Sequence, residues 1–268
     1  MSTKKRVVSA ALAAAVGVSL LCGFGFAQKD YVYQQFETAE PVTSVTVQDA
    51  SANVTIQAAD TDHITVRYAT LPDEDPLYDI SVQDGRLVVE AREDIDVDTT
   101  DDGGPALVRI QMDGHSINPF PDRELTITLP DKQYEELEAG LAVGTLKVEG
   151  VDAKTFSVAS ASGKVEVSGV QAGQLKLASA AGNIVLRDAK AENVKAGTAT
   201  GSIKIENLDA TEEVSAANAV GSVSLKQVTT SNLVIGAVIG SIQLEDVSTD
   251  SYTKAGILVW NSGSVQDR

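Results

Sequence analysis

The chain has 268 residues, 43% of them hydrophobic and only 4% aromatic, and its net charge at pH 7 is −17. Aliphatic residues recur throughout, which argues against intrinsic disorder, and the single cysteine excludes an intrachain disulfide. A surface this acidic repels nucleic acid and anionic lipid headgroups, so we expect no nucleic-acid partner.

The N-terminal segment 1–27 predicts export from the cytoplasm. Three basic residues at positions 4–6 precede an uncharged run at 7–27, the order found in secretory signal peptides. Small residues at positions 25 and 27 offer a cleavage site before Gln28. The run is also long enough to span a bilayer as an anchor, with its basic side in the cytoplasm. Both alternatives, signal peptide and transmembrane anchor, predict an extracytoplasmic protein that is membrane-anchored at the cell surface or secreted.

Residues 28–41 are interpreted as a linker, and residues 42–130 as an irregular N-terminal β part with loop insertions. Alternating apolar and polar residues in this part predict strands with one buried face. The interval between Val45 and Ile64 equals the repeat period of the later chain, which suggests that these strands stack in the same way.

A repeat with a period of about 19 residues dominates the second half of the chain. Each copy has a glycine, with apolar residues two, four and seven positions after it and polar residues between them. Such alternation with period two predicts a strand that buries one face. A unit of this length has no room for a helix as well, and only stacked units can bury their apolar rows. The marker glycines are Gly144, Gly163, Gly182, Gly201, Gly221 and Gly240.

The repeat predicts an all-β fold, a single-chain parallel β-solenoid with coils of about 19 residues. We expect regular coils over 131–262, with a C-terminal cap extending to residue 268 in which Trp260 covers the last coil. The period also runs backwards, which puts Leu125 in the place of a glycine. The glycines themselves are predicted to be structural, because a sharp corner favours a residue that adopts positive φ.

Few residues offer chemistry. His63 opens a predicted strand and His115 lies in a turn-rich loop, and neither has a cysteine near it that would suggest a zinc site. The acidic stretch 93–104 is the one candidate metal site, because alternating carboxylates can share a calcium ion. Its candidate ligands are Asp94, Asp96, Asp98, Asp101 and Asp102. The spacing does not fit an EF-hand loop, so we favour a solvated acidic insertion and expect no cofactor.

The stretch RELTITLPDKQYEELEAGLAVGTLKVEGV, together with the glycine-led coils after it, resembles a known family. It is similar to the bacterial putative-adhesin family of β-solenoid domains of unknown function, in which a strand ends in Leu-Pro before the repeats begin. The matching residues here are Leu129, Pro130, Tyr134, Leu137 and Gly144. The resemblance covers about residues 40–260 and implies the fold; the family has no catalytic residues to carry over. Its members often carry an N-terminal membrane segment, and some are encoded with envelope-stress regulators.

Three functions remain open at this point. The first is a non-enzymatic adhesin or cell-envelope scaffold whose partner is a surface polymer or an envelope protein. The second is a membrane-anchored regulatory module that senses envelope stress. The third is a glycan-active β-helix enzyme, which we disfavour because the repeats show no converging acids and few aromatic residues.

Overall fold

The structure is a computed structural model that describes residues 32–70, 77–92, 95–100, 107–112 and 123–267. Within these residues every regular element is a β-strand and no helix is present, which confirms the all-β prediction. The described part therefore also holds no helix long and apolar enough to cross a membrane. The apolar run at 7–27 lies outside the described residues.

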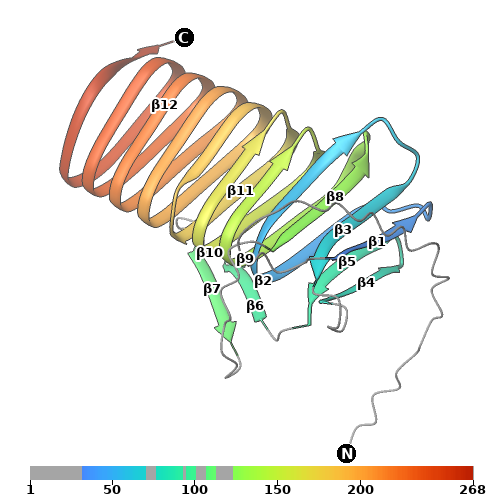
Figure 1. Cartoon of the computed structure of the whole chain (residues 1–268). Coiled ribbons are helices and arrows are strands. Elements are labelled where there is room, and N and C mark those ends of the chain that lie inside the picture. The colour runs from blue at the N-terminus through green and yellow to red at the C-terminus, as the bar shows by residue number, and fades with distance from the viewer. Residues whose placement is uncertain (1–31, 71–76, 93–94, 101–106, 113–122, 268) are drawn as a thin grey trace, which may run out of the picture.

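Ten of the twelve strands among the described residues form one mixed sheet, and β6 and β7 form a separate antiparallel pair. The strands are β1 Val32–Thr38, β2 Ser44–Ala59, β3 Ile64–Thr70, β4 Tyr78–Gln83, β5 Arg86–Ala91, β6 Ile95–Thr100, β7 Leu107–Met112, β8 Glu124–Pro130, β9 Gln133–Glu149, β10 Asp152–Ser168, β11 Gln171–Ala181 and β12 Ile184–Asp267. The long strands, β12 above all, continue around the turns of successive coils (Figure 1).

Neighbouring coils pair in parallel, offset by one period of the sequence repeat. Phe156 of β10 pairs with Leu137 of β9 on one side and with Leu175 of β11 on the other, and Leu175 pairs in turn with Val194. Figure 1 shows the result as flattened coils stacked from β9 to the end of β12. The arrangement is solenoid-like, with the usual strand separation of about 4.8 Å between coils.

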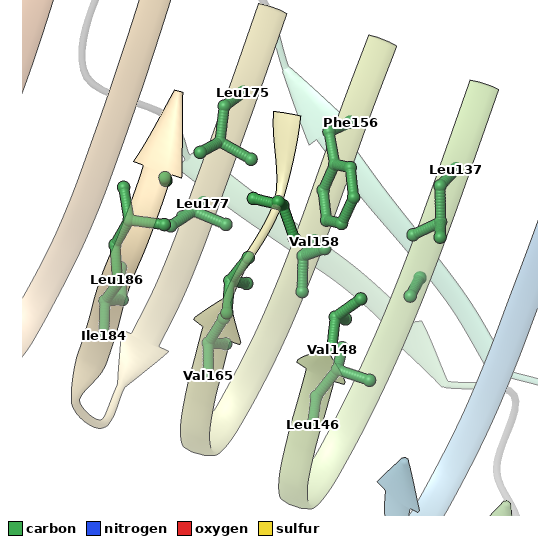
Figure 2. Close-up of a cluster of buried hydrophobic side chains, with 14 of the residues drawn as sticks. Leu137, Leu146, Val148, Phe156, Val158, Val165, Leu175, Leu177, Ile184 and Leu186 are labelled. Atoms are coloured by element: carbon green, nitrogen blue, oxygen red, sulfur yellow. The ribbon is translucent and has the colours of Figure 1, made fainter. Parts of the chain in front are cut away.

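The apolar rows fill the interior of the stack. Side chains in the same row of successive coils lie beside one another, as Leu146, Val165 and Ile184 do in Figure 2. These three side chains are at most 1% exposed. Complete burial of each such side chain contributes roughly 1.5–3 kcal/mol relative to exposure, so the rows supply most of the stabilisation.

Each coil turns twice, and the two turns differ chemically. The first turn holds the repeat glycines. The second lies six residues later and holds a residue in the left-handed region, with φ between 51° and 66°. This second column was not predicted, because its members differ in type. They are Gly150, Gly169, Asp188, Asn207, Gln227 and Asp246.

The start of the stack differs from the sequence prediction. Strand β2 lies between β8 and β9, since Val54 pairs with Leu125 on one side and with Leu146 on the other. Leu125 is therefore in the row of Leu146, and the prediction that it takes a glycine's place is wrong. Ala52 takes that place, because it pairs with Gly144.

Strands β1 and β3 close this end of the sheet by antiparallel pairing. The predicted linker 28–41 is wrong over residues 32–38, because Val32–Thr38 form β1, which pairs with β3. Strand β3 pairs with β8, also antiparallel, so Ile64 does not stack over Val45 as the period suggested. Val45 pairs instead with Leu87 of β5 and Leu137 of β9. Periodicity alone could not distinguish an antiparallel return from another coil.

Candidate functional site

The glycine turns are packed against backbone, which leaves no room for a side chain. A Cβ added to Gly182 would overlap the carbonyl oxygen of Gly163 and lie 2.7 Å from its carbonyl carbon. Each of the other five repeat glycines has the same relation to the coil before it. Five of the six have positive φ, but Gly182 does not, so close backbone approach rather than φ is the feature common to all six. These glycines shape the turns and offer no reactive group.

The acidic insertion is only partly within the described residues. Asp94, Asp101 and Asp102 lie outside them, and so does His115. Asp96 and Asp98 are on β6, where Asp98 pairs in register with Arg109 of β7. The β6–β7 hairpin contacts strands β2, β9, β10 and β11, so it lies against the first coils of the stack. Three of the five candidate ligands lie outside the described residues, so the calcium hypothesis stays a prediction.

The remaining sequence candidates do not converge. His63 is exposed and its Nδ1 lies 2.7 Å from an oxygen of Asp62. This contact lowers the pKa of the Asp62 carboxyl below its usual value. Among the described residues no three His, Cys, Asp or Glu side chains are grouped so that they could hold a metal ion.

A buried polar cluster that the sequence did not indicate lies beside β2. The hydroxyl of Tyr78 donates to an Asp49 carboxylate oxygen, and the other oxygen of Asp49 accepts from the Ser51 backbone N–H at 2.8 Å. Both Asp49 and Tyr78 are less than 5% exposed. The pKa of the Tyr78 hydroxyl is raised first by burial and then by the Asp49 charge. The edge of the Tyr68 ring packs on Tyr78 with centroids 4.8 Å apart. The cluster is sealed from solvent, so it fastens β4 to β2 and is not a binding site.

Outward-facing polar side chains form ladders between residues one coil apart. The Lys154 ammonium donates to Glu135 at 2.8 Å, and Arg187 donates to Glu206 at 2.9 Å. Hydrogen bonds from Lys204 and Arg187 lower the pKa of Glu206. Further rungs are Asp188–Asn207 at 2.8 Å, Asn193–Glu212 at 2.6 Å, Glu213–Asn232 at 2.8 Å and Lys226–Glu245 at 2.7 Å. These rungs repeat at the coil spacing, on the faces and at the left-handed turns, and make a regular polar surface.

A family model matches residues 42–212, which include the irregular strands and the first coils. The chain belongs to the Toastrack DUF4097 family. This membership confirms the family resemblance seen in the sequence. No curated protein matches the chain.

Solved structures similar to this Toastrack protein share little sequence with it. A protein from Bacteroides fragilis described as a putative adhesin has 15% identity and a TM-score of 0.55, over 90% of this chain and 98% of that one. A putative adhesin from Parabacteroides distasonis has 15% identity and a TM-score of 0.49, over 90% and 98%. A putative lipid-binding protein from the same species has 16% identity and a TM-score of 0.46, over 88% and 96%. At 15% identity, the similarity to the Bacteroides fragilis structure supports the fold alone.

Proposed function

We propose that this Toastrack protein is a non-enzymatic, extracytoplasmic, single-chain parallel β-solenoid that acts as an adhesin or cell-envelope scaffold. The observation that carries the proposal is the set of polar rungs between side chains one coil apart, which recurs at several places along the stack. A surface with a fixed repeat suits a polymer with its own repeat, because each rung adds one weak contact and the contacts sum through multivalency. The adhesin description of the Bacteroides fragilis structure supports the same proposal.

A membrane-anchored module that senses envelope stress is the alternative, and the apolar run at 7–27 favours it if it is retained. A glycan-active enzyme would require carboxylates that converge on a cleft. Several carboxylates of the coils, among them Glu135, Glu206 and Glu212, instead pair with lysine, arginine or asparagine in the ladders, so the geometry does not favour this third function.

The first experiment is to fractionate the native cell and read the mature N-terminus by mass spectrometry. A start at Gln28 in the medium or wall fraction supports a released or surface-held rod. An intact N-terminal segment in the membrane fraction supports the anchored alternative and directs cross-linking toward membrane partners. Recovery in the cytoplasm would contradict both.

Binding to polymer is then measured by co-sedimentation of the native form with purified cell-wall sacculi. Glu212→Lys combined with Glu213→Lys reverses two ladder charges, and we expect it to weaken sedimentation severalfold. The matched control, Glu37→Lys combined with Glu40→Lys, makes the same charge change at the β1 end of the sheet and should sediment like the wild type. Equal sedimentation of both double variants would show that the ladders do not bind the polymer.

A further inference from the structure

Three exposed aliphatic side chains lie along one edge of the stack. Among the described residues, the large hydrophobic side chains that are exposed are Tyr33 at 48%, Val220 at 46%, Val238 at 44%, Ile239 at 49% and Tyr252 at 37%. Val220 and Ile239 directly precede Gly221 and Gly240, and Val238 is one residue further back. We call the line of glycine turns, 140–146, 159–165, 178–184, 197–203, 217–223 and 236–242, the glycine edge.

From the second coil onward, the apolar character of the glycine edge increases along the stack. The position directly before the glycine holds Val143 in the first coil, Ser162, Ala181 and Thr200 in the next three, and Val220 and Ile239 in the last two. Val143 is half-buried and the other five side chains are exposed, so Val220 and Ile239 do not fill the core.

The glycine edge is also almost free of charge. Of the residues in its six turns, Lys164 alone is charged, and none is acidic. The six left-handed turns, counted over 149–154, 168–173, 187–192, 206–211, 226–231 and 245–250, hold nine acidic and four basic residues. The excess of acidic residues at the left-handed turns is therefore absent from this edge, and the edge lacks the repulsion that acidic surfaces show toward anionic lipid headgroups.

The chain enters the fold at the same edge. Gln34 pairs with Tyr68, which belongs to the row of Leu125, Val54 and Leu146. Leu146 follows Gly144 by two residues. Strand β1 is antiparallel to β3, and β3 is antiparallel to β8, so β1 runs parallel to β8. Because β2 is parallel to both β8 and β9, strand β1 also runs parallel to β9. Val32, two residues before Gln34, therefore lies in the row of the glycines.

Tyr33 belongs to this end of the glycine edge. It pairs with Ala69, and the guanidinium of Arg67 lies 4.1 Å from the centre of its ring. Both side chains are exposed. An aromatic ring with a cation beside it is a pair that suits the headgroup region of a bilayer.

We propose that the glycine edge rests on a lipid bilayer, with Val220, Val238 and Ile239 in its headgroup region. The proposal rests on the membrane-anchored form of the proposed function, in which residues 7–27 are retained. Only four residues separate that run from β1, so the start of the edge is held within about 18 Å of the membrane at roughly 3.5 Å per residue. A second copy is a poorer occupant, because three apolar side chains are far less than the roughly 800 Å² per partner of a stable interface.

The test places a reporter on each of the two kinds of turn. The full chain, with Cys22→Ser to remove its native thiol, is reconstituted into phosphatidylcholine vesicles as Val238→Cys or as Thr211→Cys. Thr211 is exposed beside the left-handed turn, so it is the matched control. Each thiol carries a polarity-sensitive fluorophore, and spin-labelled lipids serve as quenchers. We expect a blue shift and at least twofold quenching at residue 238, and neither at residue 211.

The other outcomes separate the edge from the anchor. If both variants float with the vesicles and both labels stay in water, the protein is attached but the edge proposal is overturned. If neither variant floats, the attachment itself fails and the edge proposal fails with it. A blue shift at residue 238 without quenching by the lipids would show that a second copy covers the edge, which also overturns the proposal.

Discussion

Successive coils approach each other closely at the glycine edge because the repeat glycines have no Cβ. We expect Gly182→Val to lower the free energy of unfolding by at least roughly 3 kcal/mol, the cost of forced overlap and backbone displacement. The loss would come from overlap of the new side chain with the Gly163 carbonyl. It would not come from backbone strain at positive φ, because Gly182 does not have the positive φ expected for a corner. Chemical denaturation of purified protein measures this loss, and unchanged unfolding would contradict the stacking.

Gly236→Ala is the matched control for that variant. A Cβ at Gly236 would lie 3.7 Å from the Cβ of Ala217, an ordinary contact, and its φ is not positive. The alanine should change stability by less than about 1 kcal/mol, because only the difference in backbone freedom remains.

The left-handed turns give a substitution that should stabilise the protein. Gln227 has φ of 54° in a column where two members are glycine and three are Asp or Asn. The left-handed conformation costs a residue with a Cβ about 1–2 kcal/mol, and it costs glycine nothing of this kind. Glycine also has more conformational entropy in the unfolded chain, which offsets part of this gain in stability. We therefore expect Gln227→Gly to raise stability by up to about 1 kcal/mol. Gln243→Gly, in an extended strand one coil later, should lower it, and a gain at both sites would refute this explanation.

The buried Tyr78 hydroxyl gives stability a dependence on alkaline pH. Its pKa in the folded state is raised above the unfolded value of about 10 by burial and by Asp49. The folded protein therefore keeps the proton longer than the unfolded chain, so stability is full below pH 10 and falls as the pH rises above it. Urea denaturation from pH 8 to 11 should show this decline, and a shallower one in Tyr78→Phe. Burial also raises the pKa of Tyr134, which leaves part of the decline in that variant.

Among the elements, the coils could be predicted from the sequence and the beginning of the stack could not. Rows such as Leu146, Val165 and Ile184 recur at a fixed period, and stacking of identical units leaves one register in which all are buried. The place of β2 between β8 and β9 depends on pairing between segments far apart in the sequence, which no local pattern encodes. The Asp49–Tyr78 cluster was missed for the same reason, since its two partners lie on different strands.

The glycine edge was visible in the sequence only as the change from Ser162 to Ile239 at the position before the glycine, from the second coil onward. Alternation with period two predicts which side chains of a strand are buried and which are exposed. It makes no such prediction for the side chains of a turn. The structure supplied that assignment through the exposure of Val220, Val238 and Ile239.

The β6–β7 hairpin should bind calcium weakly or not at all. The carboxylates of the acidic stretch do not have the spacing of an EF-hand loop, so we expect no complete set of oxygen ligands around a calcium ion. Titration calorimetry should give no dissociation constant below about 10 μM, the range of sensor sites. Asp96→Asn combined with Asp98→Asn is the control, and tighter binding that this variant abolishes would restore the calcium hypothesis.

At the scale of the whole molecule, the protein is a stack in which each coil contacts its neighbours and in which two edges have different chemistry. The charged left-handed turns and polar ladders suit polymers and partners in water, and the nearly uncharged glycine edge suits a surface that excludes water. The stack presents the left-handed turns and the glycine edge along its whole length. Its orientation relative to the membrane therefore determines which partner each of the two edges contacts.

The one-dimensional stack also predicts which deletions the fold tolerates. Removing residues 182–200 takes out one whole coil and joins Ala181 to Gly201, so that Gly201 takes the place of Gly182 and every later row keeps its register. We expect a folded protein with cooperative unfolding at a lower temperature, because one set of neighbour contacts is lost. Removing only residues 182–191 would set left-handed turns against glycine turns and expose apolar rows, so that this chain should not unfold cooperatively. Circular dichroism during heating distinguishes the two, and equal behaviour of both deletions would mean that the register between coils does not determine the fold.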